Sequence, residues 1–452
     1  MKKMELKLFV CAMAVLFSFS MFSCREGEYF LDEDALLITD GGNGTGTTTW
    51  TNDQSYLIQG KVFVNDGQVL TIEPGTVIRA RTGQGNASSA LIVARGGKII
   101  AEGTFDNPII FTAEGDDLQG SVQYLTKGLW GGLIILGNAK LNIEGGEAHV
   151  EGISIDEPRA LYGGEDDEDN SGILRYVSIR HGGTNIGEGN EINGLTLAGV
   201  GSGTTIDHIE IVSNADDGIE MFGGTVNCRN ILVAFCGDDA FDYDLGYRGK
   251  GQFWLAIADP AAGDNLVEAD GGVNPIAGKP YSIPLVYNVT FIGRGAEIGD
   301  HLISFFDNAG GKFVNSIFIR QGKGVEVEYS PNREDSYGQF KDGQLEIKNN
   351  IFWDIADNNA NSIFRVIAEP GIDISEEQIE FENYFAIAEN RIVDPGIEVE
   401  GTKIHVIPQA AIHENMAPYP DSWFHEVNYK GAFGSYNWAA GWTYLSELGL
   451  LN

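Results

Sequence analysis

The fold of this chain is decided by a ten-residue stretch that occurs twice. Ser213-Asn214-Ala215-Asp216-Asp217-Gly218-Ile219-Glu220-Met221-Phe222 is echoed 22 residues later by Phe235-Cys236-Gly237-Asp238-Asp239-Ala240-Phe241-Asp242-Tyr243-Asp244. The same offset carries Ile206 onto Cys228 and Val212 onto Ala234. A period of about 20–30 residues with short β-branched runs and glycine is typical of one coil of a β-solenoid. We therefore predict an all-β chain, a right-handed parallel β-helix whose coils lie about 4.8 Å apart.

Coils stacked in this way place acidic residues above one another. Residues one period apart then lie in columns: Asp216 and Asp238, Asp217 and Asp239, Glu220 and Asp242. Two carboxylates about 4.8 Å apart repel by about 3.5 kcal/mol at an effective dielectric constant of about 20. Ca²⁺ removes such repulsion because it takes about six to eight oxygen ligands. We therefore expect Ca²⁺ as a cofactor, bound by Asp216, Asp217, Glu220, Asp238, Asp239 and Asp242. The alternative is that these aspartates cap turns through their own backbone while water solvates the charge.

Composition and charge narrow the classes of partner. The chain has 452 residues, 60 of them glycine, and a formal net charge of −36. Abundant glycine fits a fold with a tight corner in every coil. A surface with this much negative charge argues against nucleic acid or an anionic polysaccharide as a bulk partner, and it favours the binding of cations. Cys228 and Cys236 fall within one coil, where two buried thiols are expected rather than a disulfide.

The N-terminus has the pattern of a bacterial lipoprotein. Lys2, Lys3 and Lys7 precede the apolar run Leu8–Phe19, and Met21-Phe22-Ser23-Cys24 resembles a lipobox, in which the cysteine is acylated. We predict a signal peptide over 1–23 and a lipid anchor on Cys24, which would hold the protein on the outer membrane at the cell surface. A flexible tether rich in glycine and threonine is expected over 24–50. An ordinary signal peptide with a chance cysteine is the alternative.

Short apolar runs separated by turn residues fill the middle of the chain and predict a β-helix over 51–358. A polar or aromatic residue followed by an apolar pair recurs at one coil position, where stacked asparagines would hydrogen-bond along a corner. These residues are Tyr176, His208, Asn230, Asn288, Asn315 and Asn349. Longer segments over 182–193 and 259–284 are expected to leave the coils as loops and to form a binding face.

The last part of the chain, 359–452, is expected to cap the open end of the β-helix. Ser375–Ile392 predicts a helix in which Ser375 is the N-cap and Gln378 completes a capping box. Aromatic residues crowd the final segment and would pack onto the last coil, or else form a platform that stacks on sugars. They are Trp423, Phe424, Phe433, Tyr436, Trp438, Trp442 and Tyr444.

Over roughly Tyr56–Asp354 the chain resembles the parallel β-helix proteins of the pectin-lyase-like superfamily. More narrowly, it resembles β-helical surface lipoproteins of Bacteroidota. The matching stretches are Gly194–Gly203, the two Asp-Asp coils, Tyr429–Gly434, Asn437-Trp438 and Gly441-Trp442-Thr443. This resemblance implies a non-catalytic component of a nutrient uptake system, which captures a glycan or peptide beside a TonB-dependent transporter and its lipoprotein partner.

Two other functions remain open at this stage. A galacturonan-hydrolase-like enzyme would use Asp216, Asp217, Asp238 or Asp239 as acid and base, because glycosidic hydrolysis requires paired carboxylates. A lyase would need a base, for which Arg248 and Lys250 stand nearest in sequence. A structural or adhesive solenoid is the third possibility. For ligand binding the expected residues are Tyr243, Tyr247, Arg248 and Trp254, whose rings and guanidinium would contact a sugar.

Overall fold

The computed structural model describes residues 30–187, 190–272, 274–331, 334–409 and 412–452. The predicted signal peptide over 1–23 and the predicted lipidated Cys24 lie outside the described residues. Among the described residues, no helix is both long enough and apolar enough to span a membrane.

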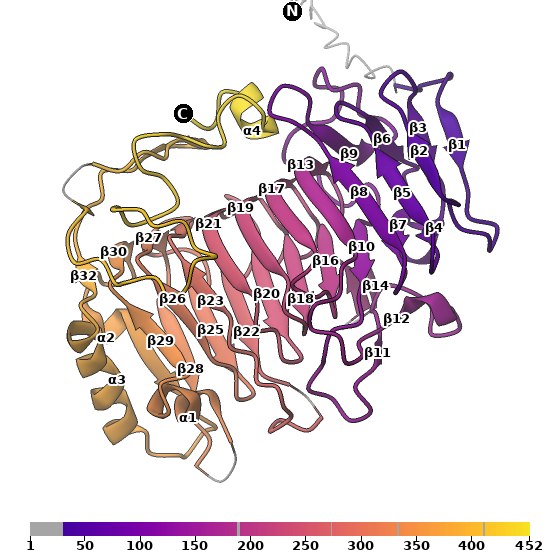
Figure 1. Ribbon diagram of the computed structural model, residues 1–452. Helices are drawn as coiled ribbons and strands as arrows, with labels where there is room; N and C mark the ends of the chain where they lie inside the picture. The colour runs from indigo at the N-terminus through magenta and orange to yellow at the C-terminus, as the bar shows by residue number, and fades with distance from the viewer. Residues whose placement is uncertain (1–29, 188–189, 273, 332–333, 410–411) are drawn as a thin grey trace, which may run out of the picture.

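Two large parallel sheets form the walls of a β-helix (Figure 1). The ten-stranded sheet contains β4 (Lys61–Val64), β7 (Ala90–Val93), β10 (Leu133–Leu136), β16 (Leu195–Ala198), β18 (Ile219–Phe222), β20 (Phe241–Asp244), β22 (Val267–Asp270), β25 (Ile303–Phe306), β28 (Val325–Glu328) and β31 (Phe364–Ile367). The eighteen-stranded sheet contains β1 (Leu36–Ile38), β2 (Thr48–Trp50), β3 (Tyr56–Ile58), β5 (Val69–Ile72), β6 (Val77–Ala80), β8 (Lys98–Glu102), β9 (Ile109–Ala113), β13 (Gly172–Arg180), β17 (Thr205–Val212), β19 (Asn227–Ala234), β21 (Lys250–Ile257), β23 (Leu285–Tyr287), β24 (Thr290–Ile292), β26 (Gly311–Val314), β27 (Ile317–Gln321), β29 (Leu345–Lys348), β30 (Ile351–Ile355) and β32 (Arg391–Ile392).

Smaller elements complete the structure. Three two-stranded pairs are β11 (Ala148–His149) with β12 (Leu161–Tyr162), β14 (Thr184–Gly187) with β15 (Asn190–Ile192), and β33 (Glu398–Glu400) with β34 (Lys403–His405). The α-helices are α1 (Ser336–Lys341), α2 (Ala360–Ile363), α3 (Ser375–Ile387) and α4 (Tyr444–Glu447). The predicted all-β parallel β-helix is therefore confirmed.

The register of the repeat is the one that the sequence predicts. Ile219 pairs with Phe241 and Glu220 with Asp242 between β18 and β20. Ile206 pairs with Cys228 between β17 and β19. Side chains alternate along each strand, so one set fills the interior as continuous apolar columns. One such column is Leu195, Ile219, Phe241, Val267, Ile303, Val325 and Phe364, all of them buried.

The predicted corner lies within the eighteen-stranded sheet, which supplies two sides of each coil. β8 and β9 pair with the first and second halves of β13, and the chain bends between those halves. The bend residues have left-handed φ angles between 48° and 59°, which asparagine tolerates better than most residues. They are Tyr176, His208, Asn230, Phe253, Asn288, Asn315 and Asn349.

The corner asparagines bond mainly to the C-terminal segment rather than to one another. Asn315 Nδ2 donates to Ala417 O at 2.9 Å, and Ala417 N donates to Asn315 Oδ1 at 2.8 Å. Asn288 Nδ2 donates to Tyr429 O at 2.8 Å, whereas its contact with Asn315 O is 3.5 Å. The prediction that the asparagines hydrogen-bond to one another along the corner is therefore wrong. The segment that follows β32 lies against the corner and forms these hydrogen bonds instead.

That C-terminal segment runs back along the β-helix toward β13 (Figure 1). Its apolar side chains pack on the outer face of the eighteen-stranded sheet, against residues such as Leu232, Leu255 and Ile319. Trp438 and Trp442 belong to this layer, so the expectation that the late aromatics cap the last coil is wrong for them. At its far end, the backbone N–H groups of Tyr444 and Leu445 donate to the buried carboxylate of Glu210 at 2.9 and 3.1 Å.

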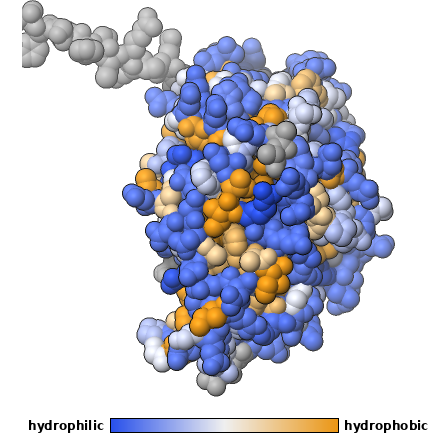
Figure 2. Space-filling model, turned by 90° about the vertical axis from the view of Figure 1, so that its left-hand side faces the viewer, coloured by the Kyte–Doolittle hydropathy of each residue, from blue (hydrophilic) through white to orange (hydrophobic). Residues whose placement is uncertain are grey.

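The last coil is covered by α3 instead. Phe381 stacks on Phe364 with a centroid distance of 4.7 Å, and Phe385 contacts Phe352 at 5.4 Å. The helix ends at Ile387, and Ser375 is its first residue rather than its N-cap. Gln378 bonds to the backbone of β31, so the predicted capping box is absent. Figure 2 views the molecule from this end and shows hydrophilic groups with separate hydrophobic ones between them.

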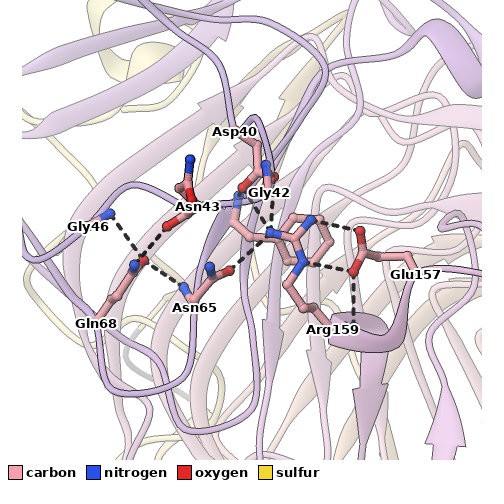
Figure 3. Close-up of polar contacts among 9 residues, drawn as sticks. Asp40, Gly42, Asn43, Gly46, Asn65, Gln68, Glu157 and Arg159 are labelled. Carbon is pink, nitrogen blue, oxygen red and sulfur yellow. Dashed lines mark hydrogen bonds and ion pairs between the residues drawn. The ribbon is translucent and has the colours of Figure 1, made fainter.

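The N-terminal segment corrects another expectation. The predicted tether over 24–50 contains β1 and β2, which pair with β3 and β5, so the β-helix extends beyond 51–358. It also extends past 358, since β31 completes the ten-stranded sheet. Arg159 anchors the loop between β1 and β2 (Figure 3): its Nη1 donates to Asp40 at 3.0 Å and to Asn65 Oδ1 at 3.1 Å. A glycine-rich loop is thus held by charge-assisted hydrogen bonds.

The loops also differ in part from the predicted ones. Segment 182–193 leaves the coils as the pair β14 and β15, as expected. Segment 259–284 contains β22 and therefore continues the ten-stranded sheet, so it is only partly a loop. The longest excursion, between β10 and β13, was not expected. It contains β11 and β12 and packs on the outer face of the ten-stranded sheet through Val150, Ile153 and Tyr162.

Candidate functional site

The outer face of the ten-stranded sheet changes character along the β-helix. Outward residues of its first strands, such as Phe63, Ile92 and Ile134, are apolar and covered by the excursion between β10 and β13. From β18 onward the same columns become acidic. We call this region the acidic face; its residues are Asp216, Asp217, Glu220, Asp238, Asp239, Asp242, Asp244, Glu268 and Asp270.

Part of the acidic face lies on the strands. Glu220, Asp242 and Glu268 form one column through the registers of β18, β20 and β22. Asp244 and Asp270 continue the neighbouring column on β20 and β22. These side chains point outward because Phe241 and Tyr243, which alternate with them, fill the core.

The other part lies in the turns that precede these strands. Asp239 N donates to Asp217 Oδ1 at 2.9 Å, and Asn265 N donates in turn to Asp239 Oδ1. His301 N donates to Asn265 Oδ1 at 3.2 Å. Each aspartate side chain therefore caps the turn of the next coil, 22 or 26 residues away, and not its own backbone as the turn-capping alternative predicts. This use occupies one oxygen of each aspartate and fixes the vertical register of the turns.

Carboxylates from both parts come close enough to share a cation. One ligand oxygen from each of Asp217, Glu220 and Asp242 lies within 4.8 Å of the others. The same limit holds for a second group, which is Asp216, Asp217 and Asp238, and for a third, which is Asp238, Asp239 and Asp264. The six predicted metal ligands are thus distributed over three overlapping groups of three carboxylates, and not over one cluster. Sequence reasoning missed Asp264 because its coil is 26 residues long instead of 22.

Burial and crowding hold protons on these groups. Burial, followed by the charges of Glu151, Glu191 and Asp238, raises the pKa of Asp216 to about 8. Burial also raises the pKa of Glu220 and of Asp242 well above the usual range, with neighbouring carboxylates as the further cause. Among the described residues, no ion pair joins the acidic face to a lysine, arginine or histidine side chain. Within the described part of the chain, bound protons rather than basic side chains thus relieve the repulsion among these carboxyl groups.

Two carboxylate oxygens of the acidic face also lack a hydrogen-bond donor. Oδ1 of Asp242 and Oδ1 of Asp244 are buried and unpartnered in the described structure. A buried acceptor without a partner is destabilising by about 1–3 kcal/mol, and more when it is charged. The donor set, all carboxylate oxygen, is the one that a hard cation such as Ca²⁺ prefers.

The excursion and the hairpin β14–β15 form a wall beside the acidic face. Asn193 Nδ2 donates to Glu151 Oε1 at 3.1 Å and also to Glu220 Oε2. Burial raises the pKa of Glu151, which adds another carboxylate to the site. Tyr162 is buried against Phe222 with a centroid distance of 6.0 Å. Sequence periodicity gave no signal for Glu151, because the excursion lies outside the repeat.

The predicted ligand-binding aromatics lie on the wrong side of the sheets. Tyr243, Tyr247 and Trp254 are at most 1% exposed and belong to the interior. Their polar atoms are satisfied there: Tyr243 Oη donates to Gly310 O at 2.7 Å, Tyr247 Oη to Val226 O at 3.0 Å and Trp254 Nε1 to Cys228 O at 2.9 Å. They cannot stack on a ligand. Cys228 and Cys236 are buried free thiols.

Arg248 and Lys250, the bases nearest to the ladder in sequence, are engaged elsewhere. The Arg248 guanidinium pairs with Asp167 and donates to Gly246 O at 2.9 Å. Lys250 Nζ lies 2.6 Å from Asp421 Oδ2 in the C-terminal segment. Neither is therefore placed as a ligand clamp or as the base of an elimination reaction beside the acidic face.

Comparison with known protein families identifies the family to which the chain belongs. A family described as a pectate-lyase-like β-helix domain matches residues 42–418. The chain belongs to this family. No curated protein and no solved structure matches it at a significant level. The pectate-lyase-like β-helix agrees with the expected superfamily, whereas the narrower resemblance to Bacteroidota lipoproteins stays a prediction. Membership of a pectate-lyase-like family establishes the scaffold, and function has to be argued from the site.

Proposed function

We propose that the acidic face binds Ca²⁺ and, together with the cation, holds an extracellular glycan without cleaving it. The observation that supports this most is the group of Asp217, Glu220 and Asp242, whose oxygens lie within 4.8 Å of one another without a basic partner among the described residues. The unpartnered Oδ1 of Asp242 adds a buried acceptor to the same group. A divalent cation offsets this charge without requiring strict geometry.

Glycan binding is supported by the shape and exposure of the same surface. Asp238 and Asp264 are exposed, so a cation held by them would keep coordination positions open to solvent. Sugar hydroxyl or carboxylate oxygens can fill such positions. Three coils of the acidic face span about 10 Å at the strand spacing, about the length of two sugar rings. Arg248 and Lys250 form ion pairs with Asp167 and Asp421, so neither is free to act as the base of a lyase.

The proposal includes the cellular setting that the N-terminal sequence indicates. A signal peptide over 1–23 and a lipidated Cys24 would place the chain on the outer membrane, facing outward. A TonB-dependent transporter with its lipoprotein partner would then take up the captured nutrient. The support for this setting is the lipobox-like pattern and the resemblance stated above. Metabolic labelling with a clickable fatty acid tests it: Cys24→Ser should abolish labelling.

Calorimetric titration tests the cation. The protein is stripped with a chelator and titrated with Ca²⁺ as wild type, as Asp242→Asn and as the control Asp156→Asn, which removes an exposed charge outside the site. Wild type and control should release heat with the same stoichiometry, while Asp242→Asn binds at least tenfold more weakly. Absence of heat and of any melting-temperature shift in the wild type would remove the cation from the proposal.

A panel of polysaccharides tests the glycan. Retention by immobilised protein and new reducing ends are measured in parallel, with Ca²⁺ or with chelator. Retention that needs Ca²⁺ and produces no reducing ends supports the proposal. If retention is the same in chelator, glycan binding does not require the cation. If no polysaccharide is retained, a structural or adhesive role is favoured.

A glycoside hydrolase is the second candidate, and the acidic turns favour it. Asp216 keeps its proton to a pH of about 8 and lies beside Asp238, an arrangement that a general acid and its partner carboxylate require. In that case new reducing ends should appear, and Asp239→Asn or Asp216→Asn should abolish them while retention persists. The polysaccharide panel therefore distinguishes the two candidates directly.

A further inference from the structure

A small cavity lies between the eighteen-stranded sheet and the hairpin β33–β34. Its volume is about 100 Å³. Apolar side chains, among them Phe235, Ile292 and Ile404, line part of it. Arg294 and Arg320 line the rest together with Thr402 of the hairpin. No acidic side chain lines this cavity.

Both arginines have a buried N–H group without an acceptor. Nε of Arg294 and Nε of Arg320 are inaccessible to water and form no hydrogen bond in the described structure. Their other contacts are sparse: Arg294 Nη2 donates to Gly263 O at 2.9 Å, and Arg320 Nη1 lies 3.7 Å from Asp354 Oδ2. Each unsatisfied N–H is destabilising, and both belong to side chains that line the cavity.

A shortage of acidic partners does not explain them. The chain has 65 Asp and Glu residues against 29 Lys and Arg, so most bases could find a carboxylate. Arg294 also borders the turn that carries Asp259 and Asp264, yet no ion pair joins it to either. The two guanidinium groups come from adjacent coils, because Ile292 pairs with Ile319 one residue before Arg320. The β-helix thus places Arg294 and Arg320 on neighbouring coils, one register position apart.

We propose that this cavity binds one oxyanion group, a carboxylate, sulfate or phosphate, between Arg294 and Arg320. Guanidinium groups bind such oxyanions through paired, charge-assisted hydrogen bonds. A water molecule takes about 30 Å³ in the liquid, so the cavity has room for an oxyanion. The Thr402 hydroxyl lies 3.3 Å from Tyr124 Oη, and it can donate to an anion when Tyr124 is the donor of that pair. A bound anion would thus also fasten β33–β34 to the coils.

The test compares anions at constant ionic strength, with chloride as the reference. Sulfate, phosphate and acetate are titrated into wild type, Arg294→Gln, Arg320→Gln and the control Lys403→Gln. Lys403 is exposed on the same hairpin, so its substitution removes a positive charge without altering the cavity. Sulfate and phosphate stabilise all proteins to some extent by exclusion from the surface, and the non-saturating response common to the four proteins measures that contribution.

We expect the melting temperature of wild type and Lys403→Gln to rise by about 1–2 °C and to saturate at about ten times the dissociation constant. In Arg294→Gln and Arg320→Gln the saturable rise in melting temperature should be lost. A response to acetate alone identifies the carboxylate of an organic ligand, while a response to sulfate or phosphate identifies an inorganic anion; both support the proposal. An equal, non-saturating response in all four proteins overturns it.

Equilibrium dialysis of the wild type with labelled sulfate, phosphate and acetate keeps the proposal falsifiable if an arginine variant fails to fold. We expect about one ion per chain for at least one of the three, with no change when Ca²⁺ is removed by chelator. Binding of none of them also overturns the proposal, independently of any result on the acidic face.

Discussion

Replacing Asp216 by asparagine should make the cation-free protein more stable at neutral pH. The folded state raises the pKa of this carboxyl from 3.8 to about 8, because the group is buried next to Glu151, Glu191 and Asp238. The folded chain therefore keeps a proton that the unfolded chain releases. A carboxyl group whose pKa is raised by folding makes the folded protein less stable as pH rises from about 4 to about 8. Above that range its contribution to the free energy of unfolding is constant.

The size of the change in the free energy of unfolding follows from the shift in the pKa of Asp216. Each pH unit between the two pKa values lowers stability by about 1.4 kcal/mol, which gives an upper bound of about 4 kcal/mol at pH 7. Asp216 is partly exposed, and solvent screening reduces this to about 2 kcal/mol. The entropy of unfolding for a chain of this length is about 0.9 kcal/mol per kelvin. Asp216→Asn should therefore melt about 2 °C above the wild type at pH 7 in chelator.

Thermal unfolding followed by circular dichroism at pH 5, 6, 7 and 8 measures the difference. The advantage of Asp216→Asn should shrink toward pH 5 and should reverse when Ca²⁺ is added, since the wild type alone keeps all three carboxylates of the group that contains Asp216, Asp217 and Asp238. Asp156→Asn, an exposed control, should follow the wild type throughout. A variant that is less stable than the wild type in chelator at pH 8, or a difference independent of pH, would refute this reasoning.

Three further substitutions probe other parts of the structure. Glu210→Gln should destabilise the protein by about 2–4 kcal/mol, because the buried carboxylate accepts N–H groups of the C-terminal segment; limited proteolysis should then cut near residue 444. Asn315→Ala should lower stability by about 2–3 kcal/mol in urea unfolding, since it loses two bonds to Ala417 and keeps a left-handed φ of 56°; Asn315→Gly should lose less. Tyr243→Phe should lower stability by about 1–2 kcal/mol and leave glycan retention unchanged, because its hydroxyl bonds only to Gly310 in the core.

The winding of the chain was predictable because a fixed period dictates it. Once Asp216 and Asp238 are separated by one coil, hydrogen bonding between parallel strands forces their neighbours into columns. The pairing of Glu220 with Asp242 follows directly and is observed. The clustering of acidic side chains was therefore visible in the sequence, while the binding of an ion by them stays a prediction.

The wrong predictions of site residues have a common physical origin. Sequence periodicity gives the position of a residue within a coil, but it does not show which other segment packs over that position. Strand alternation turns Tyr243 inward as soon as Asp242 and Asp244 face outward, so the prediction of exposed tyrosine conflicted with its own premise. Glu151 enters the site from an excursion that has no repeat. The aromatics near Trp438 cover the outer face of a sheet, a destination that no local pattern indicates.

The returning C-terminal segment has a consequence for the order of folding. Coils can wind one upon another as soon as each strand finds its predecessor. The outer-face side chains of Leu232, Leu255 and Ile319 nevertheless stay exposed to water until the C-terminal segment covers them. A chain truncated before residue 392 should therefore wind its coils and yet aggregate, because this apolar strip is left uncovered.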